Sequence, residues 1–497
     1  MNEYMQAVLI CLQPLNLLLI FVTVTVGIIF GAIPGLSATL GISLLLPITF
    51  GLSSQMSFIL LLSMWVGGVS GAFISAALVG IPGSSSAIAT CFDAYPMTKK
   101  GQASKALAIG MTASFFGTLF SVLIATFLSP IIADLALKLG PWEYFSLCFC
   151  AITLVSALSK GRVFKGIMAA GIGLLLGCFG LDPITGIQRY TFGSTNLFAG
   201  VNTICQMLGM FALCQIIRDN AKGQTKMPEV NAGTMKGFGI GIGDIIKEMS
   251  TIIRSFFIGF WIGFLPGMGS GISNMVAYGQ AKASSKNPEE YGHGAEGGVW
   301  ASETANNASI GGALIPMMAL GIPGDGITAM LLSGLTIHGL QAGPLLISQQ
   351  SGFANLVFAC VLISAIITFL IQACTKRWFP YILKIPYQYL YSVILTICFV
   401  GAYGTSNSQF NIYMMLALCF MSIFLNIADI PLSPLVLSFI LSKNLEGYFR
   451  RGVSYARGSY SEFFTRPLSL LFLLIGLASV LWPAIQYIKN KRKEKVA

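Results

Sequence analysis

The 497-residue chain is poor in charge, since only 9% of its residues are Asp, Glu, Lys or Arg whereas 55% are hydrophobic. Soluble domains carry roughly a quarter charged residues, so this chain has too few polar side chains to cover a solvated surface. Its mean hydropathy is +0.78. These values exclude disordered, collagen-like and coiled-coil chains, and they predict a membrane protein.

Residues for enzyme chemistry are scarce as well. The chain has two histidines, and it contains neither an HExxH zinc motif nor a GxSxG nucleophile motif. Its eleven cysteines lie mostly in apolar segments without a CxxC pair, which indicates small buried side chains. We therefore expect no enzyme activity, no catalytic residue, no metal site and no cofactor beyond a coupling cation.

Basic residues are absent from residues 1–98, although the chain as a whole has a net charge of +11. Elsewhere they lie mostly in short loops between apolar segments, which is typical of cytoplasmic loops and not of a nucleic-acid surface. The pattern predicts that six basic segments lie on the cytoplasmic side of the membrane: 99–105, 160–165, 218–254, 282–293, 376–384 and the tail 489–495. It leaves open the side of 443–466.

Long apolar runs, such as 15–33, 56–80 and 468–482, match helical spans of about twenty residues in a lipid bilayer. They lack the alternation of outer-membrane strands. Other runs are too short to cross alone, which indicates broken or re-entrant helices. We predict an all-α polytopic integral membrane protein with about 11–13 crossings.

An internal repeat links the two halves of the chain. Residues 71–83 (GAFISAALVGIPG) and 312–324 (GALIPMMALGIPG) are identical at seven of thirteen positions, and a second Pro-Gly pair lies upstream of each, in GAIPGL at 31–36 and GFLPGM at 263–268. Charged loops follow the first GIPG but precede the second, so the two copies are predicted to be inverted in the bilayer. Inverted repeats with helices broken at such motifs are typical of secondary transporters.

The repeats also suggest how the chain is organised. The first half, residues 1–217, contains repeat 1 at about 12–128. The polar stretch 218–250 is predicted to be a cytoplasmic connector. The second half, residues 251–497, contains repeat 2 at about 251–350, further spans and the basic tail.

Proline and glycine inside an apolar run interrupt the helix and free backbone N–H and C=O groups, which can hold anions and cations inside the membrane. Short hydroxyl and amide side chains follow each break, and an ionisable group in a membrane segment is a candidate for function. The candidate substrate- and ion-binding residues are Pro34, Gly35, Ser37, Thr39, Pro82, Gly83, Ser84, Ser85, Ser86, Pro266, Gly267, Ser270, Asn274, Glu303, Asn306, Asn307, Pro323, Gly324 and Asp325.

These features also have simpler interpretations. In these interpretations, the glycines only allow close helix packing, and the hydroxyl groups bond to the backbone of their own helix. Glu303 would be a solvated helix cap outside the bilayer. Because residues 1–98 carry no cation, an anionic substrate there needs helix dipoles, hydroxyls and a co-bound ion, which favours symport with Na⁺ or H⁺. An uncoupled organic-anion channel is the alternative, and a membrane enzyme is a third possibility without a convergent set of titratable residues.

Several long segments resemble the large membrane (permease) subunit of the tripartite tricarboxylate transporter family, and the chain looks TctA-like in 31–50, 77–107, 263–282, 296–346 and 441–471. The resemblance implies a multi-pass permease of the bacterial inner membrane that imports citrate-like or other organic carboxylates on a Na⁺ or H⁺ gradient. It also implies two partners, a small four-helix membrane subunit and a periplasmic binding protein. The family often has YGGS where this chain has VGGVSG, and Thr or Asp where it has a serine run, so the particular carboxylate is left open.

Overall fold

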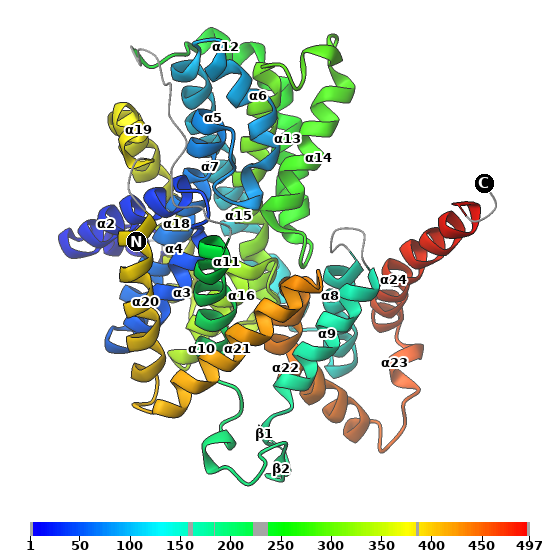
Figure 1. The fold of residues 1–497 in the computed structure, drawn as a ribbon. Coiled ribbons are helices and arrows are strands. Elements are labelled where there is room, and N and C mark those ends of the chain that lie inside the picture. The colour runs from blue at the N-terminus through cyan, green and yellow to red at the C-terminus, as the bar shows by residue number, and fades with distance from the viewer. Residues whose placement is uncertain (1–2, 158–162, 183, 222–236, 384–386, 495–497) are drawn as a thin grey trace.

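A computed structural model of the chain describes residues 3–157, 163–182, 184–221, 237–383 and 387–494 (Figure 1). This part of the chain is almost wholly helical, and its two short strands, β1 (Gly180–Leu181) and β2 (Gln188–Arg189), pair antiparallel. The helices of the first half are α1 (Glu3–Cys11), α2 (Pro14–Ala32), α3 (Ala38–Ile48), α4 (Ser54–Gly71), α5 (Phe73–Val79), α6 (Ile88–Lys99), α7 (Ala103–Ala136), α8 (Pro141–Ala157), α9 (Val163–Gly177), α10 (Thr203–Met207), the π-helical turn Leu208–Leu213, and α11 (Cys214–Ala221).

The second half continues with thirteen helices in the described part of the chain. They are α12 (Ile242–Lys247), α13 (Met249–Phe264), α14 (Gly269–Ser284), α15 (Glu296–Leu320), α16 (Gly326–Ile337), α17 (Pro344–Gln349), α18 (Ser351–Thr375), α19 (Phe379–Ile382), α20 (Tyr387–Gly404), α21 (Gln409–Ile427), α22 (Leu432–Tyr455), α23 (Glu462–Thr465) and α24 (Pro467–Glu494). Residues 222–236 of the predicted connector lie outside the described residues.

Membrane-spanning character follows from the length and composition of these helices. Within the described residues, five helical segments are long and apolar enough to cross a bilayer, among them α2, α7 and α21. Shorter apolar helices of 10–17 residues include α8, α9, α13 and α16. These findings confirm an all-α polytopic membrane protein, whereas the number of crossings stays a prediction.

All four Pro-Gly motifs interrupt helices, as the sequence predicts. The first glycine of each GIPG ends its helix in the left-handed conformation, with φ 71° at Gly80 and 68° at Gly321. The glycine of each upstream motif is also left-handed, with φ 88° at Gly35 and 79° at Gly267. Glycine adopts this conformation without the Cβ clash that other residues suffer, so the motifs turn the chain sharply between two helices.

The two repeats pack their helices in the same register. A methyl group at Gly31 of α2 would overlap with the carbonyl of Gly68 on α4, and one at Gly263 of α13 would overlap with the carbonyl of Ser309 on α15. Those four residues are equivalent in the two copies, because Gly31 and Gly263 precede the prolines by the same three residues. The duplication is therefore visible in the packing, while the opposite orientation of the copies stays a prediction.

The centre of the molecule is formed by α15 and α4. Every residue of α15 from Gly297 to Ala319 is buried, although this helix carries Glu303, Asn306 and Asn307. The α4 helix is buried from Ser57 to Gly71. A polar cluster on α15 is thus enclosed by protein and not by lipid.

Three of the segments predicted to be cytoplasmic meet at one end of the fold. Lys105 forms ion pairs with Glu296 at 2.6 Å and with Asp244 at 3.6 Å. Lys376 donates to the carbonyl of Gly237 at 2.8 Å. These contacts agree with a common side for the predicted cytoplasmic segments 99–105, 218–254 and 376–384.

The basic segment 443–466, which the charge pattern did not place, lies beside the loop that follows α9. Arg450 forms an ion pair with Asp182 at 2.9 Å, and Arg466 lies 3.5 Å from a carboxylate oxygen of Glu143. Acidic partners therefore offset part of the positive charge of this segment, and its side of the membrane stays open.

Candidate functional site

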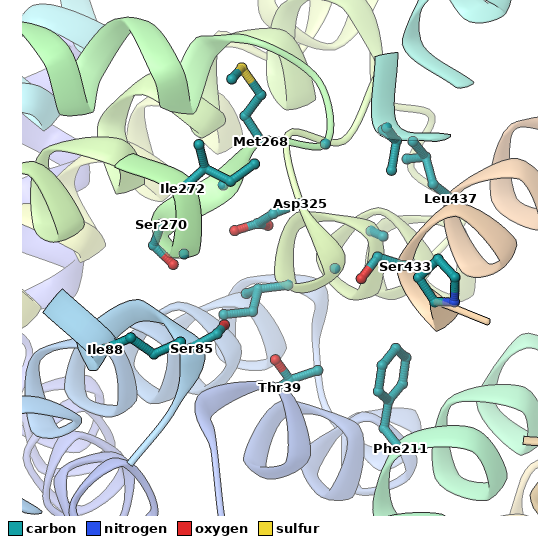
Figure 2. A pocket seen from close by; sticks show the side chains of 18 of the residues that line it. Thr39, Ser85, Ile88, Phe211, Met268, Ser270, Ile272, Asp325, Ser433 and Leu437 are labelled. Carbon is teal, nitrogen blue, oxygen red and sulfur yellow. The ribbon is translucent and has the colours of Figure 1, made fainter. Parts of the chain in front are cut away.

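Residues from all four broken helices line one cavity of about 590 Å³ (Figure 2). Thr39 follows the first break, Ser85 the second, 267–272 contain the third, and 325–329 follow the fourth. The turn between α21 and α22, α11 and the ends of α8 and α22 complete the wall. Motifs that lie far apart in the sequence therefore converge on one cavity.

The predicted site residues fall into three groups in the structure. The first lines the cavity and consists of Thr39, Ser85, Gly267, Ser270 and Asp325. The second shapes the loops around it and consists of Pro34, Gly35, Ser37, Pro82, Gly83, Ser84, Ser86, Pro266, Asn274, Pro323 and Gly324. The third, Glu303, Asn306 and Asn307, lies in a buried cluster beside the cavity.

The loop-shaping residues hold the broken helices together. Ser37 caps α3 by accepting a hydrogen bond from the Leu40 N–H at 3.2 Å. The side-chain amide of Asn274 on α14 donates to the carbonyl of Ser86 in the first GIPG loop. The first half of the chain is thereby tied to the second at the cavity wall.

Asp325 occupies a central position in the cavity lining, and Figure 2 shows its carboxylate facing the side of Ser270. It caps α16, because its Oδ1 accepts hydrogen bonds from the N–H and from the hydroxyl of Thr328, both at 2.8 Å. An acidic side chain at this place makes the cavity attractive to a cation as well as to a neutral ligand.

Arg218 is a lining residue that the sequence analysis missed. It is the single lysine or arginine among the described residues of the cavity wall, and its guanidinium donates to the side-chain oxygen of Asn426 at 2.9 Å. The polar composition of the next residues assigned it to the connector, but the structure places it on α11. The local signal in the sequence was its position directly after an apolar run. In the structure, α11 continues from a π-helical turn, and such turns are often found at functional sites.

Glu303 is fully buried and bonded to side chains from three helices. Its Oε1 accepts from the hydroxyl of Thr90 on α6 at 2.5 Å, and its Oε2 accepts from Ser114 on α7 at 3.2 Å and from Asn306 at 3.3 Å. No lysine or arginine of the described chain pairs with it. The interpretation of Glu303 as a solvated cap is therefore wrong.

Asn307 extends this network toward α4 and α18. Its side-chain oxygen accepts from Ser70 at 2.8 Å and its amide donates to Ser114 at 2.9 Å. The backbone carbonyl of Ser70 in turn accepts from Gln372 at 2.8 Å. The cluster thus joins both repeats through side-chain hydrogen bonds.

The buried cluster lies close to the cavity along α6. Ile88 at the start of this helix lines the cavity, and Thr90, two residues later, contacts Glu303. The side-chain oxygens of Asn274 and Asn306 are buried without a hydrogen-bond partner among the described residues. Such oxygens are suited to a cation, since buried polar atoms are normally paired.

The sequence model of the Tripartite tricarboxylate transporter TctA family matches residues 17–437. The chain belongs to this family. An uncharacterized 52.8 kDa protein of the TAR-I ttuC' 3' region of Agrobacterium vitis is 32% identical over 481 residues, which cover 97% of this chain and 95% of that protein. A second Agrobacterium vitis protein, from the TAR-II ttuC' 3' region, is 30% identical over 236 residues, or 48% of this chain and 98% of its own.

No solved structure matches the chain. Membership of the TctA family identifies it as the large membrane component of a tripartite transporter. Other subunits are implied by the family's description. The cavity and the buried cluster are accordingly considered as parts of a transport pathway.

Proposed function

We propose that this TctA-family chain is the permease of a secondary transporter that imports organic carboxylates of the citrate type across the bacterial inner membrane, driven by a Na⁺ or H⁺ gradient. The convergence of four broken helices on one cavity carries the proposal. Its volume of about 590 Å³ falls in the usual range for sites that enclose a small organic ligand.

Two features of the cavity suit a carboxylate. Arg218 supplies a planar guanidinium that can form paired hydrogen bonds with a carboxylate. The helices α14 and α16 begin at the cavity wall, since 269–272 and 326–327 line it. Helix N-termini present free N–H groups and a positive dipole end to an anion.

The acidic residues favour ion coupling over an uncoupled channel. Asp325 in the cavity wall repels a carboxylate unless a proton or a cation lies between them. Glu303 is buried without a basic partner in the described chain, and a buried charge of this kind is costly unless it is neutralised. Both residues are therefore proposed positions of the coupling Na⁺ or H⁺.

The two proposed partners are a small four-helix membrane subunit and a periplasmic binding protein that delivers the carboxylate. Family membership supports them.

The test is reconstitution of the chain with both partners in liposomes and uptake of labelled citrate and a panel of dicarboxylates, with and without Na⁺ and pH gradients. We expect uptake that needs one gradient and the binding protein. Asp325→Asn and Glu303→Gln should each abolish the gradient dependence, with Glu289→Gln in the exposed turn Pro288–Glu290 as the matched control. Uptake that ignores the gradient and the partner would indicate a channel, and full coupling in both variants would remove the acidic residues from the mechanism.

A further inference from the structure

A second cavity of about 570 Å³ lies farther along the helices that line the first. On α8, Val155 lines the first cavity and Cys148 the second; on α22, Leu437 lines the first and Phe439 the second. Seven residues of helix correspond to about 10 Å, and two residues to about 3 Å. The two cavities are therefore separated by a layer no more than about two helical turns thick.

That layer is apolar, and the second GIPG loop passes through it. Gly321 at the start of the loop lines the second cavity, and Asp325 at its end lines the first. Between them, Ile322 is only 1% exposed and belongs to one cluster of buried apolar side chains. The other members are Cys148, Ala151, Ile152, Val155, Ala170, Leu437 and Leu441.

The equivalent isoleucine of the first GIPG has a different environment. Ile81 is 43% exposed, whereas Ile322 is 1% exposed. The two copies of the motif therefore differ in their surroundings, and the second isoleucine is the one enclosed by apolar side chains.

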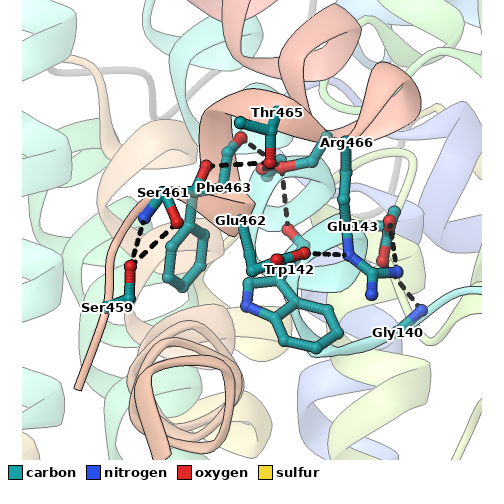
Figure 3. Close-up of polar contacts among 11 residues, drawn as sticks. Gly140, Trp142, Glu143, Ser459, Ser461, Glu462, Phe463, Thr465 and Arg466 are labelled. Carbon is teal, nitrogen blue, oxygen red and sulfur yellow. Dashed lines mark hydrogen bonds and ion pairs between the residues drawn. The ribbon is translucent and has the colours of Figure 1, made fainter. Parts of the chain in front are cut away.

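Two of the helices that cross the layer, α8 and α22, belong to a group that packs mainly on itself. The group consists of α8, α9, α22 and α24, and Figure 3 shows Arg466, just before α24, between Glu143 of α8 and Glu462. Its guanidinium also lies 3.9 Å from the ring centroid of Trp142. These contacts make the four helices one packed group, whereas α15 packs mainly on α7 and α13.

The second cavity has its own basic residue. Lys443 is the single lysine or arginine among the described residues that line it, as Arg218 is in the first. Residues 200–204, from the loop after α9 and the start of α10, also line it. An organic anion that enters from that loop would meet Lys443 before it reaches the apolar layer.

We propose that the second cavity is an entry site for the organic carboxylate and that Ile322 is the plug that separates it from the Arg218 cavity. The proposal rests on the transport function above and concerns the path, not the coupling ion. Transfer requires that Ile322 leave the apolar cluster, so that the carboxylate passes from Lys443 to Arg218. The two cavities are then successive binding sites for the carboxylate on opposite sides of the apolar layer.

The first test determines from which side of the membrane each cavity is accessible. It uses membrane vesicles of known orientation without substrate. Thr336→Cys marks the second cavity and Ser433→Cys the first, both in a Cys148→Ser chain whose own labelling is subtracted. With an impermeant maleimide we expect each cysteine to react about tenfold faster from its own side, since an open minor state is populated at roughly 10% or less. If both cysteines reacted fastest from the same side of the membrane and at equal rates, the proposal that a barrier separates the two cavities would be wrong.

The second test removes the plug. In the Ser433→Cys chain, Ile322→Ala should let the reagent reach this cysteine from both sides at similar rates, a loss of the tenfold preference. Ile310→Ala is the matched control, because Ile310 is equally buried at 1% exposed and lies outside the cluster. An unchanged preference in Ile322→Ala would overturn the role of Ile322. Neither result depends on substrate or gradient, so failure of the coupled-transport proposal is detected separately.

Discussion

The backbone N–H of Gly267 donates to the carbonyl of Gly324 at 2.6 Å, so the two broken helices of the second half are joined at their breaks. In the first half the joint is made by close packing, with Gly83 set against the carbonyl of Gly31. The N–H of Gly83 also donates to the carbonyl of Ala72 at 3.3 Å. The Pro-Gly motifs therefore have a packing role as well as a place at the cavity.

Gly83→Ala should destabilise the fold, because the added methyl group would overlap with the Gly31 carbonyl. Backbone atoms cannot move aside cheaply, so we expect a loss of about 3 kcal/mol or more. Thermal unfolding in detergent measures it. Gly171→Ala on α9 is the control, since nothing lies near its methyl group, and it should be neutral or gain up to about 1 kcal/mol. Equal melting temperatures for the two variants would contradict the packing role.

Asn307→Leu should cost more stability than Ser70→Ala. The leucine leaves the hydroxyls of Ser70 and Ser114 without this partner, and an unpaired buried group costs about 1–3 kcal/mol. Ser70→Ala removes a single bond between helices, worth about 0.6 kcal/mol on average in membrane proteins. The measurement is again the melting temperature. A larger loss in Ser70→Ala would show that Asn307 is not the hub of the cluster.

The sequence predicted the breaks well because their signal is local. A proline joined to a glycine in an apolar run interrupts the helix locally, and each of the four predicted breaks was found in the structure, whereas Pro316, which has no glycine beside it, stays inside α15. It also placed Glu303, Asn306 and Asn307 on one face, since helical spacing alone decides that. Their partners could not be predicted, because Thr90 contacts Glu303 across 213 positions of the sequence.

Arg218 shows the same limit at the cavity. Its side-chain partner, Asn426, is 208 positions away, and Asn426 lies near the end of α21, which reaches the cavity only through tertiary packing. The residues that follow Arg218 in the sequence are polar, so the sequence analysis placed it in the connector 218–250. Tertiary structure, and not local pattern, brings this cation to the four breaks.

Arg218→Gln should weaken carboxylate binding without loss of the fold. A hydrogen bond to a charged group contributes about 1.5–3 kcal/mol, which corresponds to a rise in KM of roughly 10- to 100-fold. Uptake kinetics over a range of substrate concentrations measure this rise. Arg254→Gln is the control, because Arg254 is exposed and bonds only within its own helix, to Ser250, in the described contacts. The same KM in both variants would argue against Arg218 as a substrate ligand.

Asp182 should make the loop between α9 and α10 sensitive to acid. The N–H groups of Thr185 and Ile184, with Arg450 and Arg189 beside them, lower the pKa of Asp182 from 3.8 to about 2. Because the folded pKa is depressed, the stabilisation is complete above about pH 4 and is lost as the pH falls toward 2.

Asp182→Asn should therefore lower the melting temperature at pH 7, and the difference from the unchanged chain should narrow below pH 4. Melting curves of both chains from pH 7 to pH 3 measure this. Asp134→Asn, at an exposed position of α7, serves as the control and should leave the curves together. A difference for Asp182→Asn that is constant with pH would exclude the carboxylate charge as its cause.

Lys376→Met should loosen the end of the fold where the predicted cytoplasmic loops meet. Lys376 is 4% exposed, and its ammonium donates to the Ser104 hydroxyl and to the carbonyls of Gly237 and Phe238, each at 2.8 Å. Methionine keeps the apolar stem but loses these charged hydrogen bonds, so we expect a loss of about 2 kcal/mol. Hydrogen exchange should also become faster in α12, which follows this contact in the chain. The control is Arg377→Gln at the exposed neighbouring position, which should change neither the stability nor the hydrogen-exchange rate of α12. Equal effects in both variants would mean that charge alone, and not the buried contact, holds these loops together.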